Sequence, residues 1–83
     1  MKNMTKEELY DQGMAEFAMA EYDKAVECYR KAVALDPNYF DAWHALGMAL
    51  LRANKIPEAI EAGKRLLEMG GAGTQVKPTL PAE

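Results

Sequence analysis

The stretch that decides the fold is WHALGMALL, residues 43–51, because the chain carries its pattern twice. The earlier copy, residues 9–17, is LYDQGMAEF and has the same Gly-Met-Ala at its centre. In the same register, residues 6–35 align with residues 40–69 without a gap, and we call this offset the repeat shift. Size or charge is kept at many of the aligned pairs, so the sequence contains two copies of one structural unit.

The composition predicts one small folded domain. The 83 residues are 49% hydrophobic and 28% charged, which is too apolar for intrinsic disorder. A net charge of -3 lacks the basic excess that nucleic acid binding requires, and no apolar run is long enough to span a membrane. The first residues lack the apolar core of a signal peptide, and Cys28 has no second cysteine to pair with. We therefore expect a cytoplasmic protein, with neither nucleic acid nor membrane as a partner.

The hydrophobic pattern of each unit predicts two helices, because apolar residues recur at spacings of three and four residues. Thr5 followed by Glu8 predicts a capping box at the start of the first helix, and Asp36-Pro37 predicts the end of the second. Pro57 suits the first position of the last helix, which Gly70-Gly71 should stop. The expected helices are residues 5–19, 23–35, 39–53 and 57–69.

The apolar positions of these helices define an expected core. Gly13 and Gly47 should lie where the helices of each hairpin approach closely, since a side chain there would push them apart. The residues expected to face inward or half inward are Leu9, Gly13, Phe17 and Ala20, then Ala25, Val26, Cys28, Tyr29, Ala32, Val33 and Leu35, and then Trp43, Leu46, Gly47, Leu50 and Leu51.

The two units resemble tetratricopeptide repeats, a family of helix-turn-helix units whose period equals the repeat shift. Trp43-x2-Leu46-Gly47-x2-Leu50 matches the opening of the family pattern, and Ala25-x3-Tyr29 with Asp36-Pro37-Asn38 matches its end. The resemblance implies an all-α fold, with four antiparallel helices in two hairpins that stack as a right-handed superhelix. We expect a lead-in at residues 1–5, repeats at 6–39 and 40–71, and a Gly- and Pro-containing tail at 72–83.

The resemblance also implies a concave groove, built from the first helix of each hairpin, that binds a peptide or helix of a partner protein. Members of the family that grip a terminal carboxylate use lysine, asparagine and arginine, whereas Tyr10, Met14 and Ala45 stand at those places here. Methionines and aromatic rings suit an apolar segment instead. The alternative for Phe17 and the methionines is ordinary core packing. The predicted groove residues are Tyr10, Met14, Phe17, Tyr39, His44, Met48, Leu51 and Arg52.

The last helix predicts a second candidate surface. By the repeat shift, Ile60 and Leu67 occupy the places of Val26 and Val33, which should touch the third helix. Their own counterpart is absent from the sequence, and leaving such side chains in water forgoes about 1.5 to 3 kcal/mol each. We expect them to be covered by the tail, a second copy of the chain or a different protein.

The residues predict no catalytic or metal site. His44 and Cys28 are the single residues of their kind and lie on different helices, without a metal-ligand spacing. Glu27 with Lys31, and Glu61 with Arg65, are interpreted as solvent-exposed helix pairs. We therefore predict a protein–protein interaction module without a cofactor and without enzymatic activity. The alternative is a small structural subunit that self-associates as a homodimer or higher oligomer.

Overall fold

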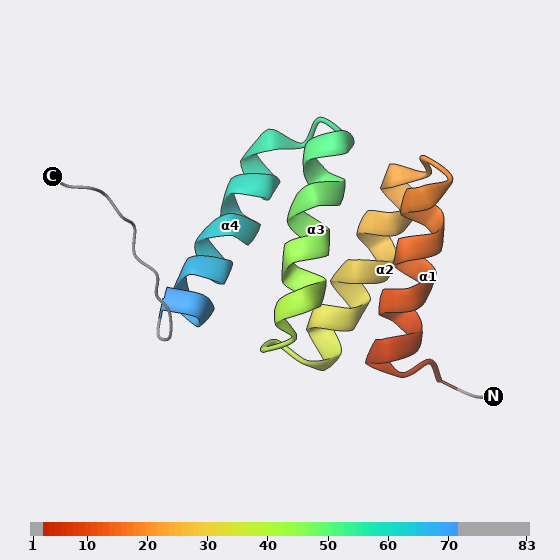
Figure 1. The fold of residues 1–83 in the computed structure, drawn as a ribbon, viewed down its shortest axis with the longest axis horizontal. Helices are drawn as coiled ribbons and strands as arrows, with labels where there is room; N and C mark the ends of the chain where they lie inside the picture. Colours follow the sequence, from red (N-terminus) through yellow and green to blue (C-terminus); the bar gives the residue numbers. More distant parts are fainter. Residues whose placement is uncertain (1–2, 72–83) are drawn as a thin grey trace, which may run out of the picture.

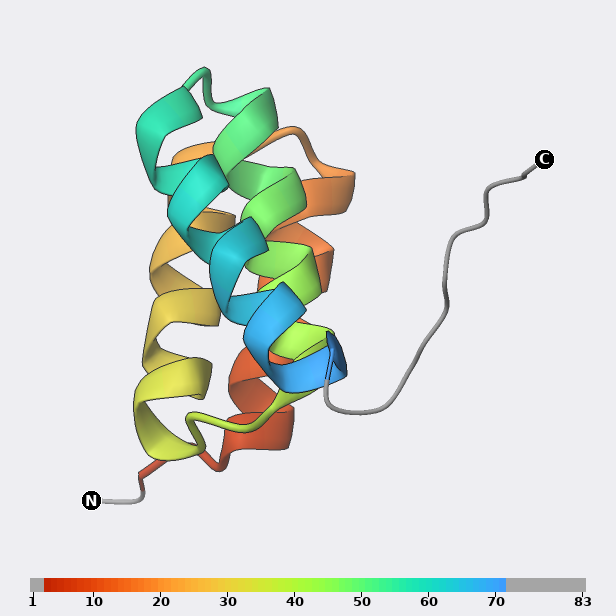
Figure 2. The ribbon, with the colours of Figure 1, turned by 90° about the vertical axis from the view of Figure 1, so that its left-hand side faces the viewer.

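The computed structural model describes residues 3–71, which form four α-helices joined by short turns (Figure 1). The helices are α1 (Lys6–Ala18), α2 (Tyr22–Leu35), α3 (Phe40–Arg52) and α4 (Ile56–Gly71). α1 packs against α2 and α3 against α4 as antiparallel hairpins, and α3 packs mainly on α2 (Figure 1, Figure 2). The predicted all-α fold of two hairpins is confirmed. The predicted tail, residues 72–83, lies outside the described residues.

The capping box at the start of α1 is confirmed. The Thr5 hydroxyl oxygen accepts a hydrogen bond from the Glu8 backbone N–H at 3.1 Å, and the Glu8 carboxylate accepts one from the Thr5 N–H at 2.9 Å. These bonds satisfy two backbone donors that a helix start leaves without partners. The sequence therefore determines where α1 begins.

Both hairpin turns close in the same way. Ala20 and Asn54 have positive φ angles of 63° and 64° and stand at equivalent places in the two repeats. The Glu21 N–H donates to the Glu16 carbonyl, and the Lys55 N–H donates to the Leu50 carbonyl, both at 2.8 Å. This is the Schellman arrangement that ends many helices. The sequence placed Ala20 both in this turn and on the apolar stripe of the first helix. Ala20 lies in the turn and is exposed, so its inward position is wrong: α1 has already ended at Ala18.

The core lies between the four helices and holds mostly alanine and branched aliphatic residues. Tyr29 and Leu50 are its largest fully buried side chains. Leu35 is 60% exposed, so its predicted inward position is wrong. It lies two residues beyond the buried Val33, which turns it to the far side of α2. The buried apolar residues are Leu9, Ala25, Val26, Tyr29, Ala32, Val33, Ala42, Leu46, Ala49, Leu50, Ala59 and Ala62.

The last helix is longer than predicted. α4 begins at Ile56 and continues through Gly70 and Gly71 instead of stopping near Met69. Neither glycine has a positive φ angle, so neither acts as the left-handed cap that the sequence suggested. Glycine can also adopt helical angles, at a cost of about 1 kcal/mol relative to alanine.

Candidate functional site

A first hollow lies where α1, α2 and α3 meet. It has a volume of about 210 Å³ and is lined by Phe17, Tyr29, His44, Ala45 and Met48. Three of the predicted groove residues, Phe17, His44 and Met48, therefore share one hollow. Tyr29 reaches it from α2, although the sequence assigned this residue to the core alone. The side chain serves both purposes, because it is buried and yet forms part of the hollow's wall.

Aromatic rings continue this surface along α1. The Tyr10 ring lies 5.8 Å from the Tyr29 ring and 5.5 Å from the Tyr39 ring, measured between centroids. Both predicted residues, Tyr10 and Tyr39, are half-buried in this cluster. Their rings hold each other in place, so they offer a rigid apolar surface. The Lys6 ammonium lies 5.2 Å from the centre of the Tyr39 ring, and Lys6 also donates a hydrogen bond to Asp36.

The rest of the predicted groove is exposed. Met14 is 49% exposed and Leu51 is 51% exposed. The Arg52 guanidinium lies 5.7 Å from the centre of the Phe17 ring, so it spans from α3 to α1 at the edge of the surface. An apolar surface with a cationic edge results, which we call the α1–α3 groove (Tyr10, Met14, Phe17, Tyr29, Tyr39, His44, Ala45, Met48, Leu51 and Arg52).

A second hollow lies between α3 and α4. Its volume is about 240 Å³, and its lining is almost wholly apolar: His44, Gly47, Met48, Leu51, Ala59, Ile60, Gly63 and Leu66. Ile60 borders it and is 54% exposed, and Leu67 is 73% exposed. Their counterparts Val26 and Val33 are buried against α3. Within residues 3–71, nothing covers Ile60 and Leu67 in the same manner.

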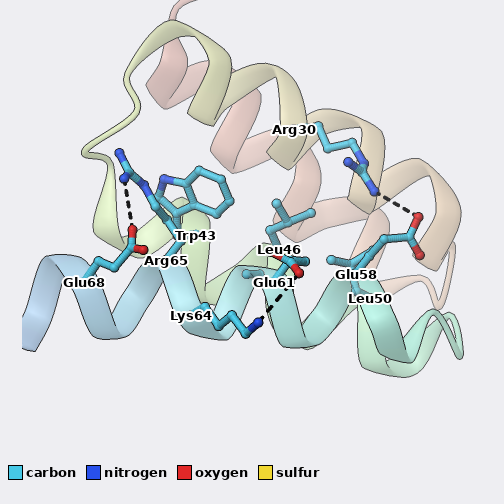
Figure 3. A pocket seen from close by; sticks show the side chains of 10 residues that line it. Arg30, Trp43, Leu46, Leu50, Glu58, Glu61, Lys64, Arg65 and Glu68 are labelled. Atoms are coloured by element: carbon cyan, nitrogen blue, oxygen red, sulfur yellow. Dashed lines mark hydrogen bonds and ion pairs between the residues drawn. The ribbon is translucent and has the colours of Figure 1, made fainter.

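A third hollow, about 470 Å³, lies between α2, α3 and α4 and was not predicted (Figure 3). Its floor includes Leu46 and Leu50, and its rim is charged. The charges pair among themselves: Arg30 with Glu58 at 3.6 Å, Lys64 with Glu61 at 4.0 Å and Arg65 with Glu68 at 3.4 Å. Glu61 thus pairs with Lys64, and not with Arg65 as predicted. Because the rim neutralises itself, the hollow offers no net charge to a ligand.

The surroundings shift the pKa values of five groups in the described part of the chain: Lys6, Cys28, Tyr29, Asp36 and Tyr39. Burial raises the pKa of Tyr29 to about 12 and also raises the pKa of the Cys28 thiol, which disfavours a reactive thiolate. Lys6 donates a hydrogen bond to Asp36, and this bond together with the Asn38 N–H lowers the pKa of the Asp36 carboxyl. The pair ties the start of α1 to the end of α2.

The described part of the chain contains no cluster of three or more His, Cys, Asp or Glu side chains that could hold a metal ion. Among residues 3–71, no helix is long and apolar enough to cross a bilayer.

Comparison with known proteins agrees with this geometry. A family model described as tetratricopeptide repeat matches residues 10–74. The chain belongs to the tetratricopeptide repeat family. The repeat shift, the two hairpins and the small residues at Gly13, Ala25, Gly47 and Ala59 are thus properties of this family.

Relatives of this repeat domain occur in larger proteins. It is 39% identical over 57 residues to the small glutamine-rich tetratricopeptide repeat-containing protein 2 of Saccharomyces cerevisiae, covering 69% of this chain and 16% of that protein. It is 34% identical over 67 residues to the peroxisomal targeting signal receptor of Eremothecium gossypii, covering 81% of this chain and 10% of that protein. No solved structure gives a significant match. The chain therefore spans a small fraction of the length of these relatives.

Proposed function

We propose that this chain is a non-catalytic protein–protein interaction module whose α1–α3 groove binds an apolar peptide or an amphipathic helix of a partner. The observation that carries the proposal is the hollow shared by Phe17, Tyr29, His44, Ala45 and Met48. A hollow of about 210 Å³ with aromatic and thioether walls fits one or two large apolar side chains. Methionine side chains are flexible and polarizable, so Met14 and Met48 can adapt to such residues.

The named relatives support a binding role. Several are named as receptors of a targeting signal, and the chain matches a segment of those receptors. The proposed ligand is internal or helical instead of a chain end, because Tyr10, Met14 and Ala45 stand where a carboxylate-binding cation would be needed. A cytoplasmic location stays a prediction.

The proposal is tested with peptides selected from a random displayed library on the immobilised protein, whose affinities are then measured by fluorescence anisotropy. Met14→Ala combined with Met48→Ala should weaken binding about tenfold, which corresponds to ~1.4 kcal/mol. Met19→Ala is the matched control, because Met19 is also exposed, at 64%, but lies outside the groove. Unchanged affinity in the double variant would exclude the α1–α3 groove as the site.

The nature of the ligand is tested separately. Amidating the C-terminus of a selected peptide removes its carboxylate charge. We expect less than a twofold loss of affinity, because the groove presents aromatic and thioether groups at the relevant places. A loss of tenfold or more would show that a carboxylate is recognised after all.

The alternative function is self-association in an assembly. The exposure of Ile60 and Leu67 favours it, because unpartnered aliphatic side chains on a small domain are typical of interaction surfaces. The arrangement that such an assembly would have is considered next.

A further inference from the structure

One face of the second hairpin collects most of the exposed apolar side chains. Six of the ten large hydrophobic residues that are exposed within residues 3–71 lie on α3 and α4. Together with His44, Gly47 and Gly63, they lie on stripes with spacings of four, three and four residues, at positions 40, 44, 47 and 51 of α3 and 56, 60, 63 and 67 of α4, and Met48 lies beside the α3 stripe. We call this face the α3–α4 wall: Phe40, His44, Gly47, Met48 and Leu51 of α3, and Ile56, Ile60, Gly63 and Leu67 of α4.

The hollow in this wall exists because an aromatic ring is missing. In the first hairpin, the Tyr29 ring fills the space over Gly13. In the second hairpin, Gly47 stands at the place of Gly13, and Gly63 stands at the place of Tyr29. A Cβ built on Gly63 meets nothing within 4 Å, so the space remains open. The second repeat thus has the hole but lacks the side chain that fills it.

The wall also carries side chains that would fill such holes. Leu67, at 73% exposure, is the most exposed large hydrophobic residue of the described chain, and it lies one turn from Gly63. Phe40, at 48% exposure, lies two turns from Gly47 on α3. Each helix of the wall therefore presents one projecting side chain and one hole on the same stripe.

These two pairs share one symmetry axis. A two-fold axis that exchanges Leu67 with Gly63 passes at the level of residue 65 on α4. One that exchanges Phe40 with Gly47 passes between residues 43 and 44 on α3. Two contacts show how α3 and α4 lie alongside each other: the Arg65 guanidinium is 5.8 Å from the Trp43 ring centre, and the Gly47 Cβ position is 3.7 Å from the Ala62 Cβ. The level of residue 65 on α4 therefore lies beside the level of residues 43 and 44 on α3, and one axis can serve both pairs.

We propose that two copies of this chain pair through the α3–α4 wall about this two-fold axis, with Leu67 and Phe40 of each copy packing over Gly63 and Gly47 of the other. Such packing is isologous, because the same patch serves both copies.

Stacking the first hairpin of a second copy on the wall is the less favourable arrangement. The core residues by which α3 packs on α2 include Ala42, Leu46 and Ala49. At the equivalent places of the first repeat, α1 carries Glu8, Gln12 and Ala15. Two of these three are polar, and burying them against the apolar wall would cost free energy that the two-fold arrangement avoids.

The first test is the mass of the full chain by sedimentation equilibrium at micromolar concentration. We expect twice the 9.2 kDa of one chain. Leu67→Glu should halve that mass while the helical circular dichroism signal stays unchanged. Leu35→Glu is the matched control, because Leu35 is 60% exposed but lies on α2 away from the wall, and it should remain dimeric. A monomeric wild-type chain, or a dimer that survives Leu67→Glu, would overturn the proposal.

Gly63→Tyr provides a variant that should fold at least as well as the wild type. The new ring has open space and restores the arrangement that Tyr29 has in the first repeat. It fills the hole from within, so the mass should fall to that of a monomer. A dimer that survives Gly63→Tyr does not use this hole, and the proposal would be wrong.

The symmetry itself is tested by disulfide cross-linking. His44 lies near the level of the proposed axis, so residue 44 of one copy faces residue 44 of the other. In a Cys28→Ser background, His44→Cys should form a covalent dimer under mild oxidation, and Met19→Cys on the exposed end of α1 should not. Equal cross-linking of both variants would contradict the two-fold arrangement. His44, Met48 and Leu51 border both the wall and the α1–α3 groove, so the two proposals are separated by their readouts: the groove by the peptide affinity of Met14→Ala, which lies outside the wall, and the dimer by the mass of Gly63→Tyr, which lies outside the groove.

Discussion

The Tyr29 ring packs against the backbone of Gly13, and a Cβ built on Gly13 would stand 2.5 Å from the Tyr29 Cε1 atom. No real Cβ comes so close to another carbon, so α1 and α2 can hold their present separation only with glycine at this position. Tyr29 is 2% exposed, and the Tyr10 ring packs against it with 5.8 Å between the ring centroids. The contact between Tyr29 and Gly13 sets the distance between α1 and α2, and it positions the Tyr29 ring that lines the α1–α3 groove.

Gly13→Ala should therefore destabilise the domain, by about 1–2 kcal/mol after the gain in helix propensity is subtracted from the overpacking cost. Gly47→Ala is the matched control. Its Cβ would meet only the Ala62 Cβ at 3.7 Å, an ordinary contact, so a gain of about 0.5–1 kcal/mol is expected. Urea unfolding followed by circular dichroism measures both. Equal effects at the two glycines would contradict the difference in packing that the structure shows.

The sequence predicted this relationship only in part. The repeat shift and the spacing of apolar residues were enough to predict all four helices to within a few residues. The same reasoning treated Gly13 and Gly47 alike, because a repeat pattern does not state which side chain the opposite helix provides. Gly13 faces Tyr29, whereas Gly47 faces the open space left by Gly63. The hollow between α3 and α4 therefore arises from a difference between the two repeats. This difference can be read from the aligned sequences, but its effect on packing can be recognised only when the positions of the helices are known.

The left-handed residues in the two hairpin turns give a second test. Ala20 has a φ angle of 63°, which costs an L-residue with a Cβ about 1–2 kcal/mol, whereas glycine adopts it freely. Ala20→Gly should raise stability by about 0.5–1 kcal/mol and raise the thermal midpoint by several degrees. Asn54→Gly should have a smaller effect, because asparagine tolerates this conformation. A loss of stability in Ala20→Gly would show that the turn differs in solution.

The sequence placed Ala20 at the end of the apolar stripe of the first helix and also in the turn that follows, but it gave no sign of the positive φ angle. Alanine is the best helix former, so its local preference does not indicate a left-handed conformation. The backbone bonds from Ala20 to Phe17 and from Glu21 to Glu16 end α1 before it. Chain reversal by the hairpin thus overrides the local preference of one residue.

The Asp36 carboxylate predicts a specific dependence on pH. Its pKa is lowered by the hydrogen bond from Lys6 and by the Asn38 N–H. A lowered folded-state pKa means that the stabilisation is complete above the unfolded value of about 3.9 and is lost as the pH falls through the folded value. Asp36→Asn keeps an oxygen that can accept the Asn38 N–H but removes the charge. The stability difference between wild type and variant should shrink below about pH 4, and a difference that is constant from neutral to acid pH would contradict it.

Trp43 on α3 contacts the connection after α2 through its ring nitrogen and contacts α4 through its face. Its Nε1–H donates to the Pro37 carbonyl at 2.8 Å, and the Arg65 guanidinium lies 5.8 Å from the ring centre. Trp43→Phe keeps a ring but loses the bond, so a loss of about 1–2 kcal/mol is expected. In an Arg65→Met background the same substitution should cost about 0.5–1 kcal/mol less, because the cation that a tryptophan face attracts best is already gone. Urea unfolding of the four proteins gives this coupling. If the losses of unfolding free energy in the two single variants add up to that of the double variant, Arg65 does not interact energetically with the Trp43 ring. The register of α4 against α3 would then depend on the buried alanines.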